Sequence, residues 1–394
     1  MRPHAIRYLR VSALALLLIA PHALAMDDVA LSAATADAMA QAASPQAITE
    51  YRRKLREYQE ARAAFDQEAG AYWSSISDKR RGRNAKRREH LAIALDDYVL
   101  TQPPVYSGPK RPANLEPEPE AKPRQHKAIP IVADLLQAAR AQFQWTPQKP
   151  ASEAEFKRAY ARVASAAGLT REQAVRVYSF ETGGNGNYDM QSGLRGGRAI
   201  STAIGYNQLL TTNSVELLAE QGHEFIRALS EKAAQLSGPP RKAMDYKIAV
   251  LKKMVAHARS VPDEWAQHEK LADTDQGWAL HAMVLDIDVG PLLQTHKLLT
   301  SVIFARAKGY HRPLTAAELE MMNLTGDGTG LDMVTMPQPM REQVPTANFF
   351  QRSGYERNPV AIRHNTVAKL LAVTDARMDS NGNLPGAKEL AAAF

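Results

Sequence analysis

The chain has 394 residues, of which 45% are hydrophobic, 23% charged and 7% aromatic, a composition typical of folded globular proteins and too apolar for wholesale disorder. This length allows two or three domains and rules out a small protein held together by disulfides. The net charge is +7 and cysteine is absent, which excludes disulfides, cysteine zinc fingers, iron–sulfur clusters, thiol nucleophiles and lipid attachment to an N-terminal cysteine.

Residues 1–25 have the pattern of a cleavable secretory signal peptide. Three arginines precede the apolar run 11–20, and the small-x-small sequence ALA at 23–25 follows it. The run is too short for a membrane-spanning helix, which needs about 20 apolar residues. We expect cleavage to lower the net charge from +7 to +4 and to leave a soluble protein in the periplasm or outside the cell, with no transmembrane segment.

Residues 26–101 are expected to form a helical, basic N-terminal extension. Aromatic and aliphatic side chains recur there at helical spacing, as on one face of a helix or helical hairpin. This stripe consists of Tyr51, Leu55, Tyr58, Phe65 and Tyr72. The run KRRGRNAKRR, from Lys79 to Arg88, holds seven cations. It is either a solvated helix face or a binding surface for an anionic polymer or a protein partner; because we expect export, we do not expect nucleic acid.

Residues 102–126 are expected to be a linker or a strap that lies on the next domain, because seven prolines within 22 residues prevent a continuous helix. Runs of alternating Val, Ile and Thr that would indicate a sheet are scarce beyond it. We therefore expect a mainly all-α domain over residues 127–380, which carries the active or binding site, and a C-terminal tail over 381–394. The expected helices cover residues 131–143, 152–167, 170–181, 205–222, 225–259, 278–308, 315–323 and 358–377.

The helix expected over residues 170–181 ends with an acidic residue. Thr170 begins this helix with a capping box, and the glycine pair at 183–184 supplies a left-handed stop. Glu181 therefore follows an apolar turn at the C-terminal end, where the helix dipole and burial both raise the pKa of a carboxyl group. Such a group can serve as a general acid near neutral pH; the alternative is an ordinary ion pair at a helix end.

No metal or cofactor is expected from the motifs. His223 begins a sequence similar to a zincin helix, but Arg227 stands where the second histidine ligand is needed. Residues 379–383 resemble part of a calcium loop, but Arg377 and Lys388 fall at its first and last ligand positions. The sequence also lacks a P-loop and a complete dinucleotide-binding fingerprint after a strand.

Three motifs resemble those of the soluble lytic transglycosylases and goose-type lysozymes. ETG at 181–183 is similar to the Glu-Ser-Gly signature of that family, and AIGYNQL at 203–209 resembles its Gly-Leu-Met-Gln-Leu helix start. MNLTG at 322–326 resembles its Tyr-Asn-Ala-Gly turn. The chain departs from the pattern because Met322 replaces the tyrosine and a large insertion separates the second and third motifs. The resemblance covers about residues 170–330.

The resemblance implies a lysozyme-like helical domain that cleaves the β-1,4 bond between N-acetylmuramic acid and N-acetylglucosamine in peptidoglycan. Glu181 would protonate the leaving oxygen and then, as a base, take the proton of the C6 hydroxyl, so that a 1,6-anhydro ring closes. No cofactor is implied. The candidate substrate-binding residues are Gln208, Asn323, Tyr206, Asn207 and Tyr188. Tyr178 and Tyr310 are further candidates for the aromatic wall that Met322 does not provide.

Asp189 leaves a second mechanism open. It lies eight residues after Glu181 in a glycine-rich loop, and a second carboxylate within about 10 Å could activate water, as in an inverting hydrolase. The alternative for Asp189 is a turn or cap. The sequence favours an exported lytic transglycosylase; the other interpretations are a lysozyme-like hydrolase, a peptidoglycan-binding or scaffold protein without turnover, and a secreted helical adaptor.

Overall fold

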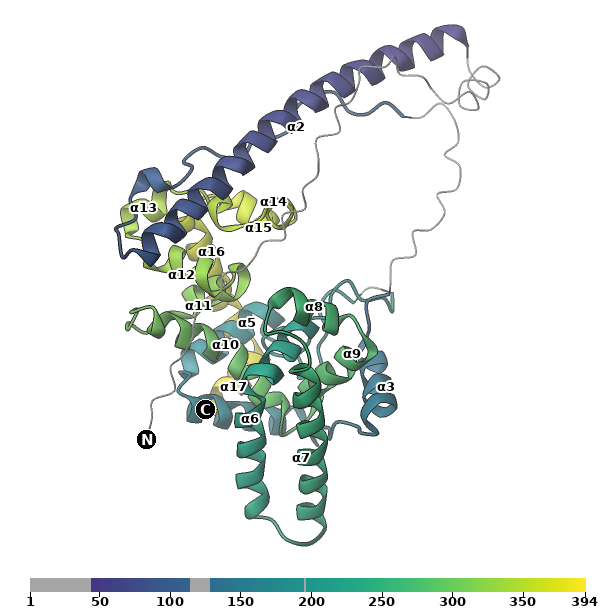
Figure 1. The fold of residues 1–394 in the computed structure, drawn as a ribbon, viewed down its shortest axis with the longest axis vertical. Coiled ribbons are helices and arrows are strands. Elements are labelled where there is room, and N and C mark those ends of the chain that lie inside the picture. The colour runs from purple at the N-terminus through teal and green to yellow at the C-terminus, as the bar shows by residue number, and fades with distance from the viewer. Residues whose placement is uncertain (1–43, 114–127, 195) are drawn as a thin grey trace. The chain divides into compact units, whose positions relative to one another are not determined.

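The computed structural model describes residues 44–113, 128–194 and 196–394 (Figure 1). These residues divide into two compact units, the first containing 44–113 and 350–365 and the second containing the rest. The described chain is mainly helical, and only isolated β-bridges occur in it, which confirms the all-α prediction. The expected signal peptide lies outside the described residues. Within them, no helix is both long and apolar enough to cross a membrane.

The first unit is built on one long helix. Helix α2, Pro45–Arg88, has 44 residues, and the hydroxyl of Ser44 caps its start by accepting from the backbone of Ala47 at 3.2 Å. The described part of the proline-rich segment packs on this helix: the Tyr72 hydroxyl donates to the carbonyl of Thr101 at 3.0 Å, and the ring of Tyr106 lies 5.3 Å from that of Phe65. The described part of this segment, expected as a linker or as a strap on the next domain, therefore packs on the helix that precedes it.

A later segment completes the first unit. Helices α14, Arg352–Glu356, and α15, Pro359–Arg363, belong to it, and the ring of Tyr355 lies 5.7 Å from that of Trp73. The sequence predicted one helix over residues 358–377 inside the second domain. The structure instead ends α15 at Arg363 and begins a new helix at Val367. The predicted domain over residues 127–380 therefore includes residues 350–365, which belong to the first unit.

The basic run at the end of α2 is largely occupied by contacts within the first unit. The buried guanidinium of Arg83 donates to the carbonyl of Asp97 at 2.9 Å and lies 4.3 Å from the ring of Tyr98. Lys86 forms an ion pair of 2.7 Å with Asp97. Arg80 donates to the carbonyl of Phe350 at 3.0 Å. These contacts give the run a structural role, and an anionic partner there stays a prediction.

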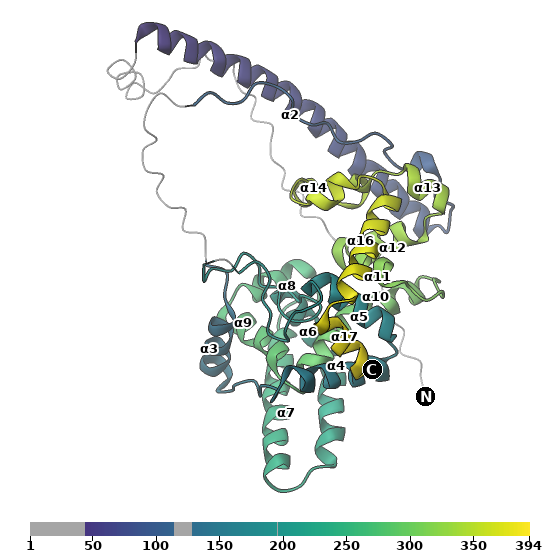
Figure 2. The ribbon, with the colours of Figure 1, turned by 180° about the vertical axis from the view of Figure 1, so that it is seen from behind.

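The second unit is an array of helices (Figure 2). It comprises α3 Val132–Phe143, α4 Glu153–Ala167, α5 Arg171–Thr182, α6 Thr211–Ala234, α7 Gly238–Ala258, α8 Trp265–Ala272, α9 Asp275–His281, η2 Ala282–Leu285, α10 Gly290–Ala307, α11 Ala316–Thr325, α12 Asp327–Thr335, α13 Gln338–Gln343, η3 Thr346–Phe349, α16 Val367–Gly382 and α17 Pro385–Ala393. The first unit adds η1, Leu95–Asp97.

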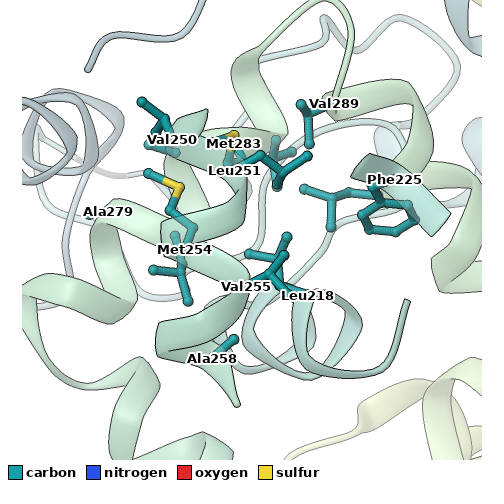
Figure 3. Close-up of a cluster of buried hydrophobic side chains, with 14 of the residues drawn as sticks. Leu218, Phe225, Val250, Leu251, Met254, Val255, Ala258, Ala279, Met283 and Val289 are labelled. Atoms are coloured by element: carbon teal, nitrogen blue, oxygen red, sulfur yellow. The ribbon is translucent and has the colours of Figure 1, made fainter. Parts of the chain in front are cut away.

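Helices α6 and α7 lie side by side as a hairpin in both views and supply much of the core (Figures 1 and 2). The sequence predicted a break after Gly222, but α6 continues to Ala234. A Cβ at Gly222 would lie 2.4 Å from a methyl carbon of Val255, so this glycine permits close helix contact. Figure 3 shows the apolar side chains that the hairpin buries with α9 and η2. They include Leu218, Phe225, Val250, Leu251, Met254, Val255, Ala279 and Met283.

Two further predictions about the second unit are wrong. Residues 205–210 do not begin a helix: Gly205 and Gln208 have φ angles of 84° and 43°, and Ile204 pairs with Leu209 in an isolated bridge, so α6 starts at Thr211. Residues 381–394 are not a loose tail, because they end α16 and form α17, which packs against α4 and α5.

Candidate active site

Helix α5 places Glu181 at its last turn, as the sequence predicted. Thr170 and Gln173 form the predicted capping box, with hydrogen bonds of 3.1 and 3.0 Å between side chain and backbone. At the other end Gly183 has a φ of 67° and ends the helix. Glu181 as a whole residue is partly exposed.

The backbone that follows Glu181 is clamped by the C-terminal helices. Gly184 has a φ of 81°, and a Cβ there would lie 2.3 Å from the carbonyl oxygen of Asn381. The amide of Ala387 donates to the carbonyl of Gly184 at 2.8 Å. The side chain of Asn381 donates to the carbonyl of Ser179 at 2.9 Å. These contacts fix the direction in which α5 ends and therefore the position of Glu181.

Asn323 braces Glu181 from a neighbouring helix. Its Nδ2 donates to Oε1 of Glu181 at 3.1 Å. Helix α11, which carries it, begins with the predicted capping box of Thr315 and Glu318, whose hydrogen bonds measure 3.1 and 3.2 Å. The structure thus brings together the first and third motifs of the sequence, which lie 142 residues apart.

Glu320 is a second carboxyl group at the site, and the sequence analysis did not identify it. It lies one turn before Asn323 on α11 and is only 2% exposed. It lies near Glu181, because each of the two carboxyl groups shifts the pKa of the other. The signal in the sequence is an acidic residue among apolar neighbours, since Leu319, Met321 and Met322 are all buried.

A lysine balances these carboxyl groups. Lys297 of α10 is close enough to both Glu181 and Glu320 to favour their charged forms, and Glu216 and Asp327 act on the same lysine. Burial lowers the pKa of Lys297, whereas the four carboxylates raise it. The positive charge therefore opposes the build-up of negative charge in a partly buried cluster.

Burial raises the pKa of Glu181 to about 7. Lys297, the hydrogen bond from Glu320, Arg377 and Asn323 act in the opposite direction. Burial also raises the pKa of Glu320 well above its usual range, and the negative charge of Glu181 raises it further. Because the two carboxyl groups interact, they release their protons as a pair, and Glu320 keeps its proton longer. Glu181 is consequently a carboxylic acid that titrates near neutral pH.

The contact between these carboxyl groups restricts the chemistry. Retaining glycosidases separate their two carboxyl groups by about 5 to 5.5 Å and inverting enzymes by about 6.5 to 9.5 Å, which leaves room for a sugar carbon or a water. Each of the carboxyl groups of Glu181 and Glu320 shifts the pKa of the other, and Glu320 is only 2% exposed. Glu320 is therefore not placed to act on a substrate as a separate nucleophile or base.

Gln208 and its neighbours serve the loop and the core. The Gln208 amide donates to the carbonyls of Gly205 at 2.7 Å and Met190 at 3.3 Å. Asn207 is fully buried and donates to the carbonyl of Gln294 at 2.7 Å. These bonds hold residues 203–209 in a turn on the protein interior. The structure thus gives Asn207 a packing role in place of the predicted contact with substrate, because no part of its side chain is exposed.

Tyr206 is also a core residue. It is fully buried, and its hydroxyl donates to the carboxylate of Glu153. Its ring makes edge-on contacts with Phe156, Tyr160 and Tyr178 at 4.9 to 5.4 Å. Burial and the charge of Glu153 raise its pKa above the usual range. A glycan-binding role for Tyr206 therefore does not fit this conformation.

Tyr188 and Asp189 lie by Glu153. The backbone amide of Tyr188 donates to Glu153 at 3.2 Å, and its ring lies 5.1 Å from that of Phe156. Burial raises the pKa of Glu153, and the charge of Asp189 raises it further. Asp189 is not among the groups that act most strongly on Glu181. The carboxyl group that acts on Glu181 is Glu320, and a water-activating role of Asp189 stays a prediction.

The position of the missing tyrosine is closed to solvent. Met322 is fully buried, so the residue that stands there packs in the core. Tyr178 is fully buried as well, and its hydroxyl donates to the carbonyl of Gly186 at 2.8 Å. Tyr310 is partly exposed and accepts a hydrogen bond from Arg312 at 2.9 Å. In the described part of the chain, no group of three or more His, Asp or Glu side chains could hold a metal ion.

Comparisons with models of protein families, with curated proteins and with solved structures found no match to this chain. The family resemblance of the three motifs therefore stays a prediction, and the chemistry is argued from the site itself.

The two raised pKa values predict that stability falls with rising pH. A carboxyl group whose pKa is higher in the folded state stabilises the fold while it stays protonated, and this stabilisation is lost as the pH passes its folded-state pKa. For Glu181 the loss begins near the ordinary pKa of 4.5 and is complete above about pH 7, whereas for Glu320, whose pKa is also raised, it adds to this decline. The slope is at most about 1.4 kcal/mol per pH unit for each proton. Urea unfolding of the wild type and of the double variant Glu181→Gln/Glu320→Gln between pH 6.5 and 8 measures it.

The pH range of this measurement begins at 6.5 because His281 also changes the stability at lower pH. Burial lowers its pKa to about 4 from the ordinary value of 6.5, so its effect on stability has the opposite sign and is complete above pH 6.5. The double variant is expected to show a shallower decline than the wild type. Equal slopes in the two proteins would contradict protonation of the carboxyl pair.

Proposed function

We propose that the chain is an exported enzyme that cleaves peptidoglycan glycan strands as a lytic transglycosylase. The observation that carries the proposal is the carboxyl group of Glu181, whose pKa is raised by burial to about 7 and which accepts a hydrogen bond from Asn323 at 3.1 Å. The family resemblance of its sequence motif supports this assignment. The signal-peptide pattern of residues 1–25 supports export to the compartment that contains peptidoglycan.

The mechanism needs only one group that exchanges protons with the substrate. Protonated Glu181 gives its proton to the glycosidic oxygen, and the bond between that oxygen and C1 of N-acetylmuramic acid breaks. The 2-acetamido group of the sugar stabilises the positive charge that develops at C1. Glu181, now a carboxylate, takes the proton of the C6 hydroxyl, and O6 bonds to C1 to close the 1,6-anhydro ring. The proton of Glu181 is restored and no water is consumed.

The geometry favours this route over hydrolysis. Hydrolysis with inversion needs a base about 6.5 to 9.5 Å from the acid, and Asp189, the candidate for that base, lies by Glu153 and Tyr188. Glu320 touches Glu181 and is almost fully buried. The interactions of both carboxyl groups thus support a mechanism in which Glu181 alone exchanges protons with the substrate.

The products distinguish the possible functions. Purified protein without residues 1–25 is incubated with peptidoglycan sacculi, and the released muropeptides are analysed by mass spectrometry. We expect 1,6-anhydro ends, which are lighter than reducing ends by one water. Reducing ends would establish a hydrolase. Binding of sacculi without any release would establish a peptidoglycan-binding or scaffold protein, an alternative that the buried Met322 favours because it provides no aromatic wall.

A further inference from the structure

We propose that Glu320 is a positioning residue that keeps its own proton and donates it in a hydrogen bond to Glu181 throughout the reaction. This inference rests on the proposed function, because it concerns the same acid. Within that function, Glu181 alone exchanges a proton with the glycan. Glu320 holds the orientation of Glu181 and stabilises the carboxylate that Glu181 becomes after the glycosidic bond breaks.

The placement of the two groups supports this division of roles. Glu181 is partly exposed, whereas Glu320 is 2% exposed and cannot reach a substrate. Oε2 of Glu320 is buried, and no donor in the described chain reaches it. An ionised carboxylate buried in this way would be strongly disfavoured, whereas a protonated carboxyl group needs only an acceptor for its O–H. Glu181 is that acceptor.

Helix α11 explains why both partners of Glu181 lie together. Glu320 and Asn323 are three residues apart, so both side chains are on the same face of the helix. Asn323 supplies an N–H donor at 3.1 Å, and Glu320 supplies an O–H donor. Two hydrogen bonds from one rigid helix fix the plane of the Glu181 carboxyl group.

Charged side chains near Glu181 and Glu320 come from the helices that pack on α11. Lys297 lies on α10, Arg377 on α16 and Asp327 on α12, and Glu181 itself lies on α5. Lys297 and Arg377 favour the ionised form of Glu181. Asp327 acts on Lys297 and accepts a hydrogen bond from Ser301 at 2.5 Å. Because these charges stay in place when the Glu320 donor is removed, we expect that removal to raise the pKa of Glu181.

Two substitutions of Glu320 distinguish a role as hydrogen-bond donor from a role in proton transfer. Glu320→Gln keeps a neutral N–H donor of the same shape, and we expect cleavage within about threefold of wild type with the same alkaline limb in the pH profile of kcat/KM. Glu320→Met removes the donor, and we expect the alkaline limb to move up by about one pH unit and kcat to fall about tenfold. Met322→Leu, a conservative change in the same helix, controls for repacking and is expected to match the wild type.

The Glu320→Gln variant tests the role of Glu320 even if Glu320→Met does not fold. Loss of activity in Glu320→Gln as complete as in Glu181→Gln would overturn it, because Glu320 would then have to transfer its proton. An unshifted alkaline limb in folded Glu320→Met would overturn it as well. A Glu320→Gln variant that keeps the wild-type activity and pH profile supports it.

A titration that does not depend on activity separates this inference from the proposed function. Carbon-13 NMR follows the side-chain carboxyl groups of the wild type and of Glu181→Gln. If the pair shares a hydrogen bond, Glu320 titrates at lower pH in Glu181→Gln, because the negative neighbour is gone. Unchanged titration of Glu320 would overturn the pairing. Failure to cleave sacculi, with the pairing intact, would overturn only the proposed function.

Discussion

Replacement of Glu181 by glutamine is expected to reduce the release of muropeptides about 10³-fold, the scale of a lost general acid. Glutamine preserves the shape of the side chain and can still contact Asn323, but it cannot give a proton to the glycosidic oxygen or take one from the C6 hydroxyl. Because burial raises the pKa of Glu181 to about 7, wild-type kcat/KM is expected to fall as the pH rises above 7. Rates of muropeptide release from sacculi measure both effects.

Asp189→Asn is the matched control for this experiment. It removes a carboxylate from the loop that follows α5 but leaves the pair of Glu181 and Glu320 unchanged, so we expect activity within a few-fold of wild type. If Asp189→Asn is as inactive as Glu181→Gln and the products carry reducing ends, the enzyme is a two-carboxylate hydrolase. If Glu181→Gln retains wild-type activity, Glu181 is not the catalytic acid.

Replacement of Gly184 by alanine is expected to destabilise the second unit by about 3 kcal/mol and to lower activity with it. A side chain at a φ of 81° costs about 1 to 2 kcal/mol. The added Cβ would also lie 2.3 Å from the carbonyl oxygen of Asn381, and such overpacking costs about 1 to 3 kcal/mol. Relief of this clash must move α16 away from α5, which displaces Glu181. Urea unfolding and cleavage of sacculi by the folded fraction measure the two effects.

Gly309 provides the comparison that isolates the clash. Its φ of 84° is nearly the same, but a Cβ there meets nothing within 4 Å. Gly309→Ala is therefore expected to cost only the backbone strain, about 1 to 2 kcal/mol, and to leave activity unchanged. Equal losses of stability in the two variants would show that contact with Asn381 does not constrain the end of α5.

Local signals allowed much of the site to be predicted. A capping box, an apolar turn and a glycine stop placed Glu181 at the end of α5, and the structure confirms each of these. The same cap-helix-glycine pattern placed Asn323 on α11. Glu320 was missed because its apolar neighbours indicate only that it is buried; its role depends on Glu181, a residue far away in the chain.

The errors about residues 203–209 and the C-terminal segment have the same physical origin. The resemblance of AIGYNQL to the Gly-Leu-Met-Gln-Leu helix start predicted a helix from Gly205, whereas the buried bonds of Asn207 to Gln294 hold a turn there. Residues 381–394 have no strong periodicity, yet Ala387 and Leu390 are buried against other helices. In both places tertiary contacts decide a structure that local propensity leaves open.

The clamp on α5 makes the order of synthesis matter. The bond between Gly386 and Asn185 joins residues 201 positions apart in the chain, so the proposed acid can be oriented only after α17 has left the ribosome and docked. Contacts of such long range form slowly, because a large loop must close before they stabilise anything. We therefore expect nascent chains that lack α17 to be inactive, even when all the preceding helices have already folded.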